Sequence, residues 1–434
     1  MRYRICVETT VPSFYYAVRD KPKMTSEPVV DELESEAAMK TNVFEKQASF
    51  KSLCAHYRKE PIVLYVGAGI SASRDPAYGL PDWVGLLNKL GNKIAGVQPP
   101  DLPPHPWDAA DRILELCVDY LKGTGWKGEK LKEEAEHQLQ DALWEMIRCP
   151  ENCVTQGKKH PFKLLNKAYL QNAPTLRTIA AFCARLVGRS HNSEVYRFGA
   201  NPRVRAVLSG NYDPYLESAA TSMFKIPVVK PVAAFGSLAG RLKEVPVHHV
   251  HGYVPHSGQK GGSDYKPLLE QLVLTRRSYE RAWRKQDVFC TTMISQIYLL
   301  RHYIALFVGF SFTDPKITKL LSQVWMEYPA AKQKGRWNYA IVRKGVDPQK
   351  QTAELEPLGV RPVFVTEYDD IPNLLGAVYE AGLQDDHPDG QLELPLYAGR
   401  RMQPSLGKHS MPCAKIWEML YTCHQCHPRV LGES

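Results

Sequence analysis

A short apolar run that ends in a glycine turn constrains the fold of this chain more than any other feature. Residues 62–66 read Ile-Val-Leu-Tyr-Val, a composition typical of a strand buried on both faces of a parallel sheet, and Gly67, Ala68 and Gly69 follow directly. Glycines let a backbone approach a phosphate with no Cβ in the way, and the start of a helix offers free N–H groups to an anion. The same residues also suit a tight strand-to-helix turn that binds nothing.

Similar runs recur along the sequence, and helical patterns separate most of them. They lie at residues 204–208, 226–229, 245–250, 304–308, 339–342 and 362–365. Alternating strands and helices predict an α/β fold, a doubly wound, Rossmann-like parallel sheet whose ligand lies at the carboxyl ends of the strands.

Residues from about 88 to 200 carry amphipathic helix patterns and no strand signal. One apolar stripe consists of Ala135, Leu139, Leu143, Met146 and Ile147, and a second of Leu176, Ile179, Ala180, Cys183, Leu186 and Val187. We therefore expect a helical insert module that packs on the sheet.

Three polar motifs follow predicted strands, at the edge where a ligand would lie. They are Ser209-Gly210-Asn211-Tyr212-Asp213, His249-Val250-His251-Gly252 and Val308-Gly309-Phe310-Ser311-Phe312-Thr313-Asp314-Pro315. An asparagine amide both donates and accepts, and histidine is the natural general base near neutral pH. Each motif also has a structural interpretation: an Asx-turn for Asn211 and Asp213, and a helix cap for Asp314, which we expect to be its main role.

In this order the glycine turn and the three motifs resemble the sirtuin family, in its bacterial antiphage-defence branch, over residues 60 to about 345. The resemblance implies catalytic roles for Asn211, at the nicotinamide ribose, and for His251, as the base. It implies NAD-binding roles for a further set: Gly67, Ala68, Gly69, Ser71, Asp82, Asp213, Gly309 and Ser311. Asp82 lies in the segment that in sirtuins folds over the nicotinamide. Val84 stands where that segment has an arginine, so this contact is not carried over.

The resemblance implies an NAD+ hydrolase (NAD glycohydrolase) that releases nicotinamide and ADP-ribose and depletes NAD in abortive infection. Deacetylating sirtuins usually carry two Cys-x-x-Cys zinc pairs after the catalytic histidine, whereas only Cys290 lies between His251 and Gly309 here. NAD is then the substrate, no metal is needed, and control falls to a homo-oligomer or a defence partner such as a DNA translocase or an Argonaute-like protein. Two alternatives stay open: an NAD-dependent protein deacylase, and a non-catalytic module that senses NAD or ADP-ribose.

Composition sets weaker bounds on partners and location. The net charge of +9 comes from 55 basic and 46 acidic residues, a mild excess that does not predict nucleic-acid binding. We expect the densest basic stretch, residues 276–285, to be a solvated helix face. The apolar runs are too short for a membrane span and residues 1–20 do not resemble a secretory signal, so we expect a cytoplasmic protein whose ten cysteines are thiols.

The two ends fall outside the resemblance. Residues 1–41 are expected to be an N-terminal extension, in which 1–22 resemble the first strand of a PIN-type nuclease but are too short to supply its acidic site. Residues 42–385 are expected to form the catalytic domain, with a glycine-rich loop at 256–264 that is either a lid or a surface loop. Residues 386–434 are expected to be a tail, although Cys423-His424-Gln425-Cys426-His427 matches a haem-attachment string.

Overall fold

The computed structural model describes residues 46–71, 83–95, 102–103, 105–148, 173–189, 196–224, 228–231, 244–255, 271–284, 288–327 and 335–383. All of them belong to one compact unit, Phe44–Ser434. The PIN-like stretch, Asp82, the loop at 256–264 and the cysteine–histidine tail lie outside the described residues.

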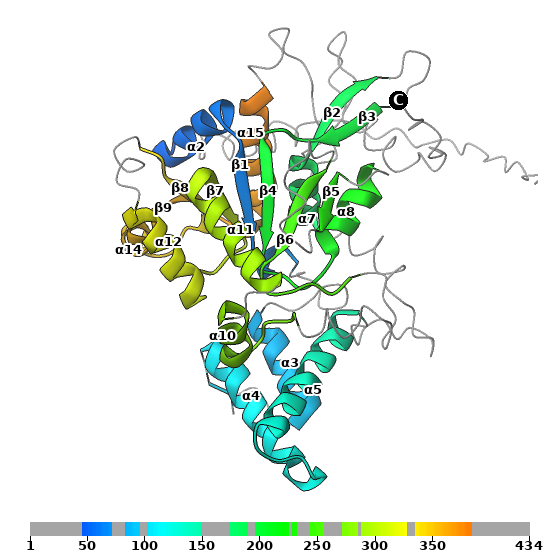
Figure 1. Cartoon of the computed structure of the whole chain (residues 1–434). Coiled ribbons are helices and arrows are strands. Elements are labelled where there is room, and N and C mark those ends of the chain that lie inside the picture. The colour runs from blue at the N-terminus through cyan, green and yellow to red at the C-terminus, as the bar shows by residue number, and fades with distance from the viewer. Residues whose placement is uncertain are drawn as a thin grey trace, which may run out of the picture. The chain divides into compact units, whose positions relative to one another are not determined.

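The centre of the fold is a parallel sheet of seven strands in the order β5-β6-β4-β1-β7-β8-β9 (Figure 1). The strands are β1 (Ile62–Val66), β4 (Val204–Ser209), β5 (Val229–Pro231), β6 (Val245–His249), β7 (Ile304–Val308), β8 (Asn338–Arg343) and β9 (Val360–Val365). Six of the seven predicted strands match observed ones, whereas the one predicted at 226–229 shares only Val229 with β5; the α/β fold class is confirmed. The strand order reverses beside β1, which is where open sheets of this kind bind ligands.

Helices cover both faces of the sheet, as a doubly wound fold requires. Ile62, Leu64 and Val66 face one apolar core, together with α2 (Ala48–Lys59), α7 (Pro174–Phe182), α8 (Tyr215–Phe224) and α15 (Ile371–Leu383). Val63 and Tyr65 face the other, with α11 (Val288–His302), α12 (Pro315–Glu327) and α14 (Pro348–Leu355). Since side chains alternate along a strand, burial on both faces explains why β1 is apolar at every position.

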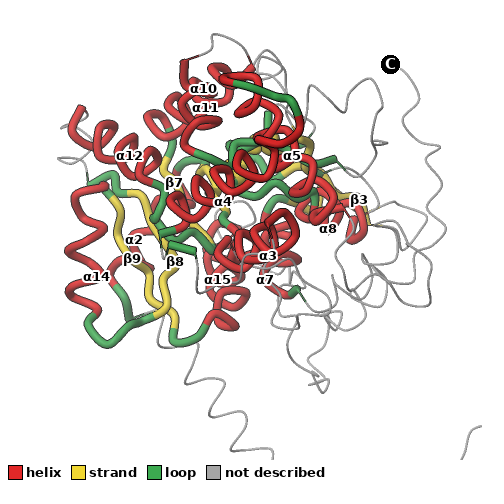
Figure 2. Tube along the Cα trace, turned by 90° about the horizontal axis from the view of Figure 1, so that it is seen from below, coloured by secondary structure: helices red, strands yellow, loops and turns green. Residues whose placement is uncertain are grey.

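A further group of helices lies at the carboxyl end of the sheet, at the bottom of Figure 1 and nearest the viewer in Figure 2. This helical group consists of α3 (Trp83–Ala95), α4 (Pro106–Leu121), α5 (Gly128–Arg148) and α10 (Arg276–Arg284). The predicted stripe on α5 is present: Ala135, Leu139, Leu143 and Ile147 are buried, and Met146 packs against the core.

The second predicted stripe was wrong at its C-terminal end. Helix α7 ends at Phe182, and Leu186 and Val187 lie in β2 (Ala184–Arg189), which pairs antiparallel with β3 (Tyr196–Ala200). Asn201 stabilises this ending, because its Nδ2 donates to the carbonyl of Phe182 at 2.8 Å. Spacing alone does not distinguish a buried strand from a helix in so short an apolar segment.

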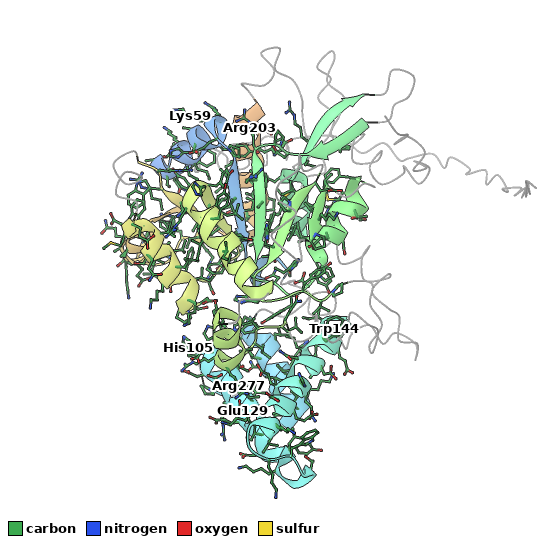
Figure 3. All side chains as sticks on the ribbon, viewed as in Figure 1. Lys59, His105, Glu129, Trp144, Arg203 and Arg277 are labelled. Carbon is green, nitrogen blue, oxygen red and sulfur yellow. The ribbon has the colours of Figure 1, made fainter. Side chains whose placement is uncertain are left out.

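Two arginines of the basic stretch, Arg276 and Arg277, pair with acidic side chains of the helical group while their own side chains stay partly exposed to solvent. Arg276 pairs with Asp108 and Asp111. Arg277 pairs with Glu136 and with Glu129, and Figure 3 labels Arg277 and Glu129. The Arg277 Nε lies 3.5 Å from a carboxylate oxygen of Glu136. These pairs connect α10 to α4 and α5, so the charges join helices that are distant in the sequence.

No helix in the described parts of the chain is both long and apolar enough to cross a membrane.

Candidate functional site

The turns after β1 and β7 pack directly on each other. The N–H of Gly67 donates to the carbonyl of Val308 at 3.0 Å, and that of Gly69 to the carbonyl of Gly309 at 3.1 Å. A Cβ on Gly67 would overlap the carbonyl oxygen of Gly309, and Gly309 has a φ of +62°. The glycines are therefore required by the contact between the two turns, whatever they bind besides.

Ser71, Asn211 and Asp213 form one buried hydrogen-bonded cluster. The Asn211 Nδ2 donates to the Ser71 Oγ at 3.0 Å, and that hydroxyl donates to the Asp213 Oδ1 at 3.2 Å. The backbone N–H of Tyr215 donates to the same carboxylate oxygen at 3.1 Å. The motif after β4 and the end of the glycine turn after β1 thus meet, as their places on adjacent parallel strands predict.

One oxygen of this cluster has no partner among the described residues. The Asn211 Oδ1 is buried and accepts no hydrogen bond, although the amide nitrogen beside it is bonded. An unpartnered buried carbonyl is costly, and this one leaves an acceptor available to a further donor.

Burial raises the pKa of Asp213 to about 6, against the opposing effect of its hydrogen bonds and of His249. The folded state therefore binds a proton that the unfolded state releases at lower pH, and stability falls as the pH rises from about 4 to about 6.

Asp213→Asn is expected to stabilise the protein above pH 6, because the amide keeps the acceptor oxygen and has no charge to desolvate. The expected gain is about 1–2 kcal/mol at pH 7.5 and near zero at pH 4. Thermal unfolding of both proteins at these pH values measures it. Equal stability differences at the two pH values would contradict the assignment of a raised pKa to Asp213.

His251 lies just beyond the end of β6 at His249, between the sheet and the helical group. Its Nε2 is 3.4 Å from the Asp314 Oδ2, and its ring is 5.8 Å from that of Tyr279 and 6.4 Å from that of Trp107, centroid to centroid. Tyr279 also donates from its hydroxyl to Asp314 Oδ2 at 3.2 Å. Because β6 ends at His249, the alternation of side chains along a strand does not set the direction of the His251 ring.

The surroundings of His251 favour a neutral imidazole whose Nδ1 is the basic atom. Burial lowers the pKa of His251, and the Asp314 carboxylate opposes this only in part. Since a carboxylate accepts hydrogen bonds, it favours the tautomer with the proton on Nε2. Nδ1 is buried and has no partner among the described residues. In this tautomer it carries no proton and presents a lone pair.

Asp314 caps α12, as predicted, in addition to its contact with His251. Its Oδ1 accepts from the N–H groups of Lys316 and Ile317 at 2.8 and 3.2 Å, in the first turn of α12. Ser311, three residues earlier, is exposed, and its hydroxyl lies 2.8 Å from that of Thr313. Phe312 between them has a φ of +56°, a strained value for this residue type.

Sequence reasoning missed three residues around His251: Asp314 as its charged partner, and Trp107 and Tyr279 as its aromatic neighbours. Asp314 follows a strand, which is a position typical of site residues. Its expected role as a helix cap, however, already explained an aspartate there. Trp107 and Tyr279 belong to helices α4 and α10, and no local pattern in those helices indicates a site.

Among the described residues, no group of three or more histidine, cysteine, aspartate or glutamate side chains could hold a metal ion.

Comparison with known families matches residues 205–363 to the SIR2-like domain family. The matched range runs from β4 to β9 and includes Asn211, His251 and Asp314, whereas β1 and the glycine turn precede it. The resemblance to sirtuin-like proteins inferred from the four motifs is thereby confirmed.

Two relatives of the chain are both named NAD(+) hydrolase ThsA. The protein from Cytobacillus dafuensis is 22% identical over 213 residues, 43% of this chain and 39% of the relative. The protein from Bacillus cereus (strain MSX-D12) is 26% identical over 164 residues, 38% of this chain and 30% of the relative. The chain thus spans well under half of the length of either relative.

Proposed function

We propose that the chain is an NAD+ hydrolase that cleaves NAD+ with water to nicotinamide, ADP-ribose and a proton. The observation that carries the proposal is the pair of buried, unpartnered atoms at the sheet edge, Asn211 Oδ1 and His251 Nδ1. Both are acceptors in the tautomer that Asp314 favours, so they suit a ligand that offers hydroxyl donors, as a ribose does. The names of the two relatives support the same substrate.

In this proposal the glycosidic bond to nicotinamide breaks through an oxocarbenium-like state. Asn211 orients the ribose and the attacking water through its Oδ1, which is held in place by the bond from its Nδ2 to Ser71. His251 accepts a proton at Nδ1 from a ribose hydroxyl or the water, and the Asp314 carboxylate at Nε2 stabilises the imidazolium that forms. The Gly67–Ser71 turn, Asp213, Gly309 and Ser311 are proposed to bind the rest of NAD+.

The biological setting is also a proposal. Because uncontrolled loss of NAD would kill the cell, we expect the activity to be restrained until infection, by a homo-oligomer or by a partner protein. The resemblance to the antiphage-defence branch supports this setting.

NAD+ consumption by the purified chain tests the proposal, with nicotinamide and ADP-ribose separated by chromatography. Nucleic acid and candidate partner proteins are added in turn, and we expect equal amounts of the two products in at least one of these conditions. A mock purification from cells that lack the gene controls for contaminating hydrolases. Tight NAD+ binding without turnover under every condition, or deacylation of an acyl-lysine peptide coupled to NAD+ use, would replace the proposal with one of the two alternatives.

A further inference from the structure

A second histidine, His249, lies next to the backbone of Asn211 and has a hydrogen-bond partner at each ring nitrogen. Its Nδ1 is 2.7 Å from the backbone carbonyl oxygen of Asn211, and its Nε2 is 2.8 Å from the Glu217 Oε1. Both His249 and Glu217 are buried. Neither residue is in the catalytic or NAD-binding set, and neither contact is explained by the proposed reaction.

The partners fix which atoms of His249 carry protons. A carbonyl oxygen only accepts, so Nδ1 must donate to Asn211. A carboxylate at Nε2 then favours a proton there too, which makes the pair an imidazolium and a carboxylate. Burial lowers the pKa of His249, but the charge and hydrogen bond of Glu217 and the bond to Asn211 outweigh it and raise the pKa overall.

Asn211 is thereby held at three points that leave one atom available. Its backbone N–H donates to the Ser209 Oγ at 3.2 Å, its carbonyl accepts from His249, and its Nδ2 donates to Ser71. The remaining polar atom, Oδ1, is the one that has no partner among the described residues.

We propose that the His249–Glu217 pair is a positioning device, in which Glu217 on α8 orients the ring so that Nδ1–H fixes the backbone of Asn211 and aims its Oδ1 at the substrate. This inference rests on the proposed function, because it assigns a purpose to the direction of Asn211. His249 and Glu217 are positioning residues and do not touch the substrate.

Two substitutions separate the two bonds of His249. In His249→Asn, the amide nitrogen takes the place of Nδ1 and still donates to Asn211, but nothing reaches Glu217. In His249→Gln, the amide nitrogen takes the place of Nε2 and still donates to Glu217, but the Asn211 carbonyl loses its donor. The positioning bond is therefore kept in the first variant and lost in the second.

We expect kcat for NAD+ hydrolysis to be at least about tenfold higher in His249→Asn than in His249→Gln, with KM values within about threefold of each other. Thermal stability should follow the opposite order, because His249→Asn leaves the Glu217 carboxylate buried and unpaired. A second substitution, Glu217→Gln, removes that charge and should restore the stability of His249→Asn without lowering its kcat. If kcat instead follows stability across the variants, the pair is only structural and the inference falls.

A readout that needs no turnover separates this inference from the proposed function. The side-chain amide signals of Asn211, in protein labelled with ¹⁵N-asparagine and assigned by their absence in Asn211→Asp, should shift in His249→Gln and stay in His249→Asn. If these signals behave as expected but the wild-type protein does not hydrolyse NAD+, the proposed function fails and the positioning role stands. If NAD+ is hydrolysed and the signals do not move in His249→Gln, the positioning role fails alone.

Discussion

Asn211→Ala is expected to reduce NAD+ turnover about a hundred- to thousandfold, because it removes the Oδ1 that we propose orients the reacting ribose while the contact between Ser71 and Asp213 remains. The loss should appear in kcat, since an interaction that orients the reacting atoms contributes more to the transition state than to substrate binding. Product formation measured by chromatography at saturating NAD+ gives this number directly.

The same substitution should leave the melting temperature almost unchanged. It removes one hydrogen bond to Ser71, worth about 1 kcal/mol, and with it the cost of burying an unpartnered oxygen, which is about 1–3 kcal/mol. His251→Ala is the matched comparison at the other unpartnered atom. A drop of many degrees with either variant would show that the side chain supports the fold, and the loss of turnover would then say nothing about catalysis.

The sheet could be predicted from the sequence because both of its faces are buried. Each strand then has to be apolar at nearly every position, which gives β1 and β7 the same uninterrupted pattern in the sequence and in the structure. The hairpin of β2 and β3 is a separate two-stranded sheet, so this argument does not predict it. Its apolar residues, Leu186 and Val187, follow a helix without a break in spacing, and only the end of α7 at Phe182 separates them.

Half of the candidate site was predictable for a related reason. Ser71, Asn211 and Asp213 follow adjacent parallel strands, and carboxyl ends of such strands meet at one edge, so sequence position alone brings them together. The contacts of His251 with Trp107 and Tyr279 depend instead on how the helical group packs against that edge. The order of the strands does not determine where those helices pack.

The helical group and His251 are joined through α10. Arg277 pairs with Glu129 and Glu136 of α5, and Tyr279 two residues later donates its hydroxyl to Asp314. A movement of α10 would therefore change the surroundings of Asp314 and His251 directly. This connection makes Asp314 the residue whose replacement tests the site most sharply.

Asp314→Asn is expected to lower kcat about ten- to hundredfold with little change in stability. The amide keeps an oxygen that can cap α12, as Asp314 Oδ1 now does for Lys316 and Ile317, and asparagine is as good a cap as aspartate. It loses the negative charge that faces His251 Nε2, so the imidazolium formed when His251 accepts a proton is no longer stabilised. Asp314→Ala removes the cap as well and should be less stable than Asp314→Asn by about 1 kcal/mol.

The pH profile of kcat/KM identifies the cause of that loss. His251 must be neutral to act as a base, and the charge of Asp314 raises its pKa against the lowering effect of burial. Without that charge the pKa of His251 falls further, so the acid limb of the Asp314→Asn profile should move to lower pH while its plateau drops. A plateau that drops with no shift of the acid limb would mean that Asp314 acts on turnover by some route other than the charge it presents to His251.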